Sequence, residues 1–150
     1  MEKVNQVDLS NDRALAVLHF AFRAVVEQPD KILARRGLSR VHHRILYFVR
    51  VHPDLSVGEL LRILAVTKQA LHKPLAELVD KGLVSSTAGL DRRVRSLALT
   101  HKGAALEEQI SGLQREMFAR AFLHGGKREW FEVMRRLAEV KQAAVDARRG

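Results

Sequence analysis

Two short helices followed by a hairpin constrain the fold of this chain more than any other feature. Ser56 and Glu59 form an S-x-x-E capping box, which predicts the start of a helix. After a tight turn, Thr67 caps a second helix. The runs 83–87 and 94–99 are short and apolar or β-branched, and a glycine lies in the loop between them, so they predict a hairpin. This order of elements is typical of a winged helix-turn-helix.

The second helix is predicted to run from Thr67 to Lys81, although Pro74 lies inside it. An interior proline costs about 3 kcal/mol, because it lacks a donor and crowds the preceding turn. We expect the helix to tolerate Pro74 because that flank faces solvent, and to bend there. The apolar residues cross the proline without a phase shift and comprise Leu71, Leu75, Leu78 and Val79.

Polar side chains gather at the start of this helix, on the side opposite the leucines. A helix fits the major groove of DNA, where its N-terminal residues reach base edges. Glutamine pairs with adenine, lysine pairs with guanine or phosphate, and free N–H groups at a helix start hold a phosphate. The predicted DNA contacts on this helix are Thr67, Lys68, Gln69, His72 and Lys73. The alternative is an ordinary exposed helix face.

The hairpin tip carries Arg92 and Arg93. A basic hairpin beside a recognition helix can reach phosphates or the minor groove. The chain has 26 Lys and Arg residues against 17 Asp and Glu, a formal net charge of +9, which favours an anionic partner such as nucleic acid. We therefore predict that both arginines contact DNA, with a solvated turn as the alternative.

Long helices are predicted on both sides of this region. The first begins at Asn11 or Asp12 and ends or bends at Pro29, and Gly37 closes the turn that follows. Its apolar stripe comprises Leu15, Leu18, Phe22, Val25 and Val26. A helix that Ser39 caps carries the stripe Val41, Ile45, Phe48 and Val49.

Two more helices follow the hairpin. One runs from Thr100 to about Phe122, with Leu106, Ile110, Leu113 and Met117 on its apolar side. Gly125 and Gly126 interrupt the helical pattern. A last helix is predicted at residues 127–148. The side chains expected to face inward on it are Trp130, Met134, Leu137 and Val140 or Val145.

Several classes of protein are disfavoured by what the sequence lacks. There are no cysteines, so disulfides, thiolate catalysis and Cys-ligated zinc are excluded. The nucleotide-binding, serine-hydrolase and zinc-protease motifs are missing, so we expect no enzyme and no cofactor. His42 and His43 are adjacent and point to different helix faces, and we predict no metal site. Neither a signal peptide nor a membrane span is evident, so we expect a cytoplasmic protein.

The stretch Asp91–Gly103, "DRRVRSLALTHKG", resembles the wing signature of the MarR family of bacterial transcription regulators. The segment "TKQALHKPLAELVDKGLV" is similar to the recognition helix of a subgroup of that family, proline included. The resemblance implies a mainly α (α+β) fold, a winged helix-turn-helix with long N- and C-terminal dimerisation helices. Residues 1–150 would form a single domain, with the DNA-binding lobe at 38–103 and the dimerisation helices at 11–36 and 104–148.

The resemblance also implies a function. Members of the family bind a pseudo-palindromic operator in double-stranded DNA as homodimers, usually repress nearby genes, and are commonly released by a small ligand such as an aromatic acid. Arg92 or Arg93 would enter the minor groove, and Asp91 would orient an arginine such as Arg95, a further DNA contact, through a salt bridge. The alternative for Asp91 is a turn residue that favours the loop. Without cysteine, this chain cannot be one of the family's thiol-based peroxide sensors.

A ligand site is predicted among the aromatic residues of the long helices, which otherwise serve as core or interface. His19 and Arg23 are polar groups inside a long apolar stripe and could pair with a carboxylate. The predicted ligand-binding residues are His19, Phe22, Arg23 and Tyr47.

The function predicted is therefore sequence-specific DNA binding by a homodimeric repressor with a small-molecule effector. The alternative is a winged helix used for protein contacts, or as an architectural nucleic-acid-binding module without sequence specificity. A steep salt dependence with little operator preference would favour that alternative.

Overall fold

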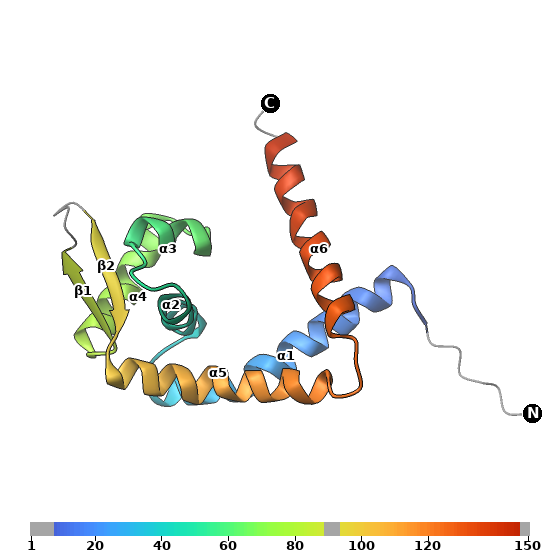
Figure 1. Ribbon diagram of the computed structural model, residues 1–150, viewed down its shortest axis with the longest axis horizontal. Helices are drawn as coiled ribbons and strands as arrows, with labels where there is room; N and C mark the ends of the chain where they lie inside the picture. The colour runs from blue at the N-terminus through green and yellow to red at the C-terminus, as the bar shows by residue number, and fades with distance from the viewer. Residues whose placement is uncertain (1–7, 89–93, 148–150) are drawn as a thin grey trace, which may run out of the picture. The chain divides into compact units, whose positions relative to one another are not determined.

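The computed structural model describes residues 8–88 and 94–147 (Figure 1). It divides into two compact units, and the boundary in the chain lies between Gln114 and Arg115. The elements in chain order are α1 (Asn11–Arg35), α2 (Arg40–Val51), α3 (Val57–Leu64), α4 (Lys68–Asp80), β1 (Val84–Ala88), β2 (Arg95–Leu99), α5 (His101–Ala121) and α6 (Lys127–Ala147). The mainly helical class with one small sheet is as predicted.

The core of the first unit lies where α2 packs against α3, α4 and the hairpin. Ile45, Leu46, Leu60 and Leu78 are completely buried there. The stripe predicted for α2 faces this core, and His42 and Leu46 join it. Because apolar burial is the main stabilising term in a small domain, this lobe has a hydrophobic core of its own.

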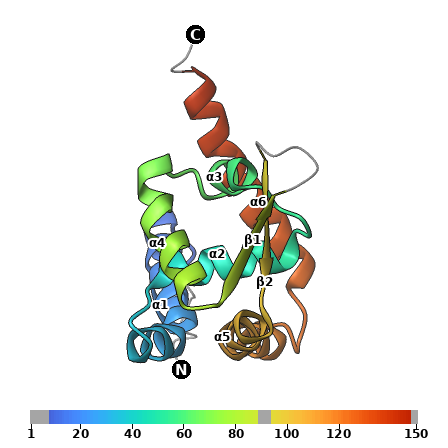
Figure 2. The same ribbon diagram turned by 90° about the vertical axis from the view of Figure 1, so that its left-hand side faces the viewer.

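The hairpin is a two-stranded antiparallel sheet in which Val84 pairs with Leu99 and Ala88 pairs with Arg95. Figure 2 shows it beside α2 and α4, with which its strands are in contact. A short bridge joins β2 to the chain before α3, where the Leu97 N–H donates to the Leu55 carbonyl at 2.9 Å. The sequence pattern did not predict this bridge, because one extended residue pair has no periodicity to detect.

Helix α1 corrects two predictions. Its N-cap is Ser10, whose Oγ accepts from the Arg13 N–H, and not Asn11 or Asp12. The helix also continues through Pro29 to Arg35, where a turn had been predicted. Gly37 lies just beyond the end of the helix with φ of +66°, as expected of a C-terminal glycine.

The proline in α1 is accommodated by a side chain from another helix. Proline cannot donate to the carbonyl four residues earlier, which for Pro29 is that of Val25. The side-chain amide of Gln114, on α5, donates to that carbonyl at 3.2 Å. Pro29 itself is buried, so its ring contributes apolar contacts to the core.

Helix α4 is continuous across Pro74, as predicted, and Thr67 caps it by accepting from the Ala70 N–H at 3.1 Å. The expectation that Pro74 faces solvent is wrong, because Pro74 is buried together with Leu71 and Leu78. Ala70, whose carbonyl loses its helical donor, is exposed, so water can replace that donor. Val79, placed in the apolar stripe, is 39% exposed.

The base of the hairpin is tied to α5 by Thr100. Its hydroxyl donates to the Gly82 carbonyl at 2.6 Å and accepts from the Gly103 N–H at 3.0 Å. The Thr100 N–H donates to the Leu83 carbonyl at 3.1 Å. Thr100 therefore caps α5, as predicted, and also fixes the turn between α4 and β1.

In the second unit, an aromatic cluster connects the end of α5 with the start of α6. The ring of Trp130 lies edge-on to Phe118 and Phe122, with centroids 5.3 and 5.9 Å apart. Of the inward apolar stripe predicted on α6, Trp130 packs in this cluster and Met134 is half-buried. The prediction is wrong for Leu137 and Val140, which are 53% and 68% exposed, and the side chain of Val145 lies outside the described residues. None of the helices in the described residues is long and apolar enough to cross a membrane.

Candidate nucleic-acid interface

The start of α4 presents an exposed polar face. Leu71, Pro74 and Leu78 anchor the opposite side of the helix in the core. The side chains predicted to contact DNA on this helix are all exposed, namely Lys68, Gln69, His72 and Lys73. The hydroxyl oxygen of Thr67 accepts from the Ala70 N–H in the cap, so the Thr67 O–H and the remaining N–H groups of the first turn are the donors that this end offers a phosphate.

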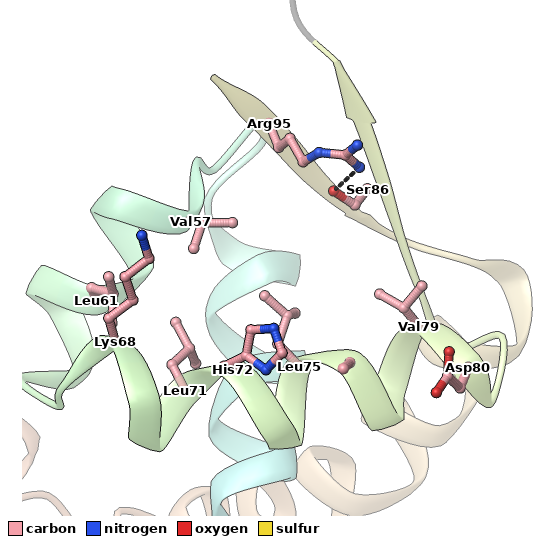
Figure 3. Close-up of a pocket in the computed structure, with 11 residues that line it drawn as sticks. Val57, Leu61, Lys68, Leu71, His72, Leu75, Val79, Asp80, Ser86 and Arg95 are labelled. Atoms are coloured by element: carbon pink, nitrogen blue, oxygen red, sulfur yellow. Dashed lines mark hydrogen bonds between the residues drawn. The ribbon is translucent and has the colours of Figure 1, made fainter. Parts of the chain in front are cut away.

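Residues from α4 and from the hairpin meet at one groove. Lys68 and His72 line it from the helix, and Arg95 lines it from β2 (Figure 3). The groove has a volume of about 360 Å³, and its floor is apolar, with Val57, Leu61, Leu71, Leu75 and Val79. Three of the predicted DNA contacts therefore surround one apolar depression, which the sequence pattern did not predict.

Arg95 is exposed, and its one hydrogen bond within residues 8–88 and 94–147 is a long contact in which its Nη1 donates to the Ser86 hydroxyl at 3.4 Å. Toward the described residues, the guanidinium uses one of its five donors. Asp91, Arg92 and Arg93 lie outside the described residues, so the predicted salt bridge between Asp91 and Arg95 stays a prediction.

The first turn of α2, Arg40–Arg44, makes polar contacts with three other helices. Arg40 binds Asp30 of α1 through two parallel hydrogen bonds, with Nη2 at 2.7 Å and Nε at 3.0 Å from the carboxylate oxygens. The Nε2 atoms of His42 and His43 lie 3.0 Å from Glu77 Oε2 of α4 and 2.9 Å from Ser111 Oγ of α5. This turn therefore connects the helix-turn-helix to α1 and α5.

The electrostatics of this turn follow from its partners. The Arg40 hydrogen bonds lower the pKa of Asp30, and Asp30 raises the pKa of Arg40 in return. Burial lowers the pKa of His43, and the nearby carboxylate of Glu107 opposes this shift only in part. Glu107 is itself completely buried, with Arg50 Nε 2.7 Å from its Oε2. His43 is therefore neutral at pH 7.

A cavity of about 220 Å³ lies beside the same turn, between α1, α2 and α5. Its lining comprises Phe22, Val26, Arg40, His43, Arg44, Tyr47 and Gln114. Two of the four predicted ligand residues, Phe22 and Tyr47, line this cavity, and His19 and Arg23 do not. His19 instead lies edge-on to Phe20, with ring centroids 5.4 Å apart.

Comparison with known proteins identifies the family. A model of the MarR family matches residues 36–93. The HTH-type transcriptional regulator PetP of Rhodobacter capsulatus is 40% identical over 115 residues, which are 76% of this chain and 69% of PetP. The chain belongs to the MarR family of DNA-binding helix-turn-helix transcription regulators.

Solved MarR-family structures share the fold. The M. tuberculosis transcriptional regulator MOSR, solved in complex with DNA, aligns with a TM-score of 0.62 and 27% identity over 90% of this chain and 98% of MOSR. S. aureus MepR, solved in a complex with DNA, aligns with a TM-score of 0.69 over 93% of this chain and 99% of MepR. Its identity to this chain is only 14%, so that likeness concerns the fold alone.

Several residues of this MarR-family site were missed by sequence reasoning. Arg40, His43 and Arg44 line the cavity, but in the sequence they read as the polar start of a helix. Glu107 falls beside the apolar stripe of α5, and nothing local shows that Arg50 lies next to it. Only the unusual density of basic residues in "RVHHR" could have drawn attention to this turn. In the described residues, no group of three or more His, Asp or Glu side chains is arranged to hold a metal.

Proposed function

We propose that this MarR-family regulator is a cytoplasmic homodimer that binds a pseudo-palindromic operator, represses nearby genes and is released by a small aromatic acid. The main observation in favour of DNA base recognition is the exposed polar face of α4, which lies beside Arg95. Direct readout needs a rigid helix with donors and acceptors at its outer surface, and Thr67–Lys73 supply both. The complex of MOSR with DNA supports this proposal.

The homodimer is supported by apolar surface that a single chain leaves in water. On α1 the exposed large apolar side chains are Leu15, Val17, Leu18, Phe20 and Phe22. On α6 they are Trp130, Phe131, Val133, Leu137 and Val140. Monomeric proteins rarely expose contiguous apolar patches of this kind, and a second copy of the chain would cover them.

The effector is supported by the chemistry of the cavity beside α2. Phe22 and Tyr47 supply aromatic walls for a ring. Arg40 is bound to Asp30, whereas Arg44 has no bonded partner among the described residues. We assign Arg44 as the group that would bind the carboxylate of an aromatic acid.

The proposal is tested by binding of the purified protein to the DNA upstream of its own gene and to scrambled DNA, at physiological salt. We expect a ratio of affinities above about 10³, within the range for specific DNA-binding proteins. A ratio near one, with steep salt dependence, would favour the architectural alternative.

Base reading is tested by Gln69→Ala. We expect it to change the preferred base at one position in each half-site and to leave the affinity for scrambled DNA unchanged, because base contacts carry specificity and phosphate contacts do not. Gln109→Ala, on the exposed face of α5, is the matched control and should change neither quantity. If Gln69→Ala keeps the operator preference of the wild-type protein, Gln69 is not a residue that contacts bases specifically.

A further inference from the structure

A histidine of α2, His42, is hydrogen-bonded to α4 on a side of that helix away from its exposed polar face. We propose that His42 and Glu77 are positioning residues for DNA reading: through Ser39, His42 and Glu77, α2 holds the recognition helix at the rotation that specificity requires. This inference rests on the proposed function and assigns a role to two residues that do not lie on the DNA-reading face.

The backbone of α2 fixes the tautomer of His42. The Ser39 N–H lies 3.0 Å from His42 Nδ1, and the Ser39 hydroxyl lies at the same distance. A backbone N–H can only donate, so Nδ1 is the acceptor and carries no proton. The proton of the neutral ring is therefore on Nε2, which donates to Glu77 Oε2 at 3.0 Å. His42 is only 6% exposed, whereas the side chain of Glu77 is 33% exposed, so the histidine end of this pair is the one shielded from water.

Glu77 lies on the flank of α4 that faces α2. At 100° per residue, Pro74 and Glu77 follow one another on this flank, between the buried leucines and the exposed Lys73. On the other flank Leu75 and Val79 line the groove, which is open. Figure 3 shows His72 and Lys68 on that groove side of the helix.

Hydrogen bonds at the C-terminal end of α4, such as that from the Leu83 N–H to the Leu78 carbonyl, hold the turn into β1, and the bond from His42 to Glu77 adds a directional restraint between α2 and the middle of α4. Burial of Leu71 and Leu78 sets which side of α4 faces the core, but apolar contacts lack the angular dependence of a hydrogen bond. The open groove does not oppose a rotation toward it. In the described part of the chain, the bond between His42 and Glu77 is the only side-chain hydrogen bond that joins α4 to another helix.

Base reading depends on that rotation. Gln69 and Lys73 lie roughly 80° and 40° from Glu77 around the helix, so turning α4 moves both side chains across the DNA surface. A bidentate base contact needs both of its hydrogen bonds in line, whereas a phosphate contact tolerates displacement. Loss of the restraint should therefore lower specificity more than overall affinity.

The variants separate this role from a structural one. His42→Gln keeps the capping box, because glutamine at this position also accepts from the Ser39 N–H, but it no longer reaches Glu77. Glu77→Ala removes the acceptor from the other side. Glu77→Gln is the matched conservative variant, since its carbonyl oxygen still accepts from His42 Nε2.

The probe is a duplex that the wild-type protein selects from a random library, compared with scrambled DNA. We expect His42→Gln and Glu77→Ala each to lower the affinity ratio by about five- to tenfold, as for the loss of one base contact, with affinity for scrambled DNA retained. Glu77→Gln should stay within about twofold of wild type, and the double variant His42→Gln/Glu77→Ala should lose no more than either single variant. Unchanged ratios in both single variants would overturn the proposal, as would a loss in Glu77→Gln equal to that in Glu77→Ala.

A second measurement, on the protein without DNA, tests the restraint between His42 and Glu77 independently of the proposed function. If the wild-type protein selects no duplex, the proposed function has failed, and amide hydrogen exchange then decides on the restraint alone. His42→Gln should speed exchange in α4, 68–80, relative to the hairpin strands. Exchange in α4 equal to that of the wild-type protein would overturn the proposal whatever the protein does with DNA.

Discussion

Gly103 is a residue at which the backbone leaves no room for a side chain. A Cβ atom there would lie 1.9 Å from the carbonyl oxygen of Leu83, far inside van der Waals contact. That carbonyl also accepts from the Thr100 N–H, so it cannot move without loosening the joint between the hairpin and α5. The glycine in the motif Leu-Thr-x-x-Gly is thus required by close packing, and the threonine by its two hydrogen bonds.

Gly103→Ala should therefore destabilise the protein by about 1–3 kcal/mol or more, as for overpacking in a filled core. Urea denaturation measures the change. Gly58→Ala is the matched control, because a Cβ there meets only Ser56 Oγ at 4.0 Å and alanine is the better helix former. We expect that control to be neutral or slightly stabilising; equal losses in the two variants would contradict the packing argument.

His43 makes stability depend on pH. Burial lowers its pKa in the folded chain, so below about pH 6.5 the unfolded chain binds a proton that the folded chain resists. Stability should consequently fall as the pH drops from 7 toward 5. His43→Gln should flatten this decline in urea denaturation series, whereas His124→Gln, at an exposed position, should keep the wild-type slope.

At the scale of elements, helices whose boundaries depend on local signals were predicted well. Ser56 with Glu59, Thr67 and Thr100 all cap helices as expected, since a cap depends on neighbours within the same turn. Helices α1 and α4 were predicted less well because each contains a proline. Local rules place a break or a solvent-facing flank there, but burial and a partner from another helix decide the outcome.

The contribution of the hydrogen bond from Gln114 to the Val25 carbonyl to the free energy of unfolding can be measured. Gln114→Ala leaves this half-buried carbonyl without its donor and should cost about 1–2 kcal/mol. In a Pro29→Ala background the helix regains its own N–H, so the same substitution should cost clearly less. A double-mutant cycle by urea denaturation measures this coupling; additive effects would show that Gln114 does not replace the missing donor.

At the scale of the whole molecule, the winged helix-turn-helix and its family were predictable from the sequence, and the cavity was predictable only in part. Phe22 and Tyr47 stand out as aromatic residues on long helices. Arg44 lines the cavity with them only because α1, α2 and α5 converge, a tertiary arrangement that one sequence does not display. The hairpin tip with Arg92 and Arg93 lies outside the described residues, so its predicted role stays a prediction.

The exposed apolar face of α6 predicts the assembly state. Leu137→Glu places a charge on that face and should shift the protein toward monomer in light scattering at micromolar concentration, because burying an unpaired charge in an interface is unfavourable. Ile63→Glu, on the exposed side of α3, is the matched control and should leave the dimer intact. A monomeric wild-type protein, or a dimer unaffected by Leu137→Glu, would contradict this use of α6.

The proline in α1 also has a consequence for inheritance. As long as position 29 is proline, substitutions that remove the side-chain amide at position 114 are disfavoured, because they leave the carbonyl of Val25 without a donor. A lineage that replaces the proline releases that constraint, and glutamine at 114 can then be lost without penalty. The two positions, 85 residues apart in the chain, should therefore change together among descendants of this gene.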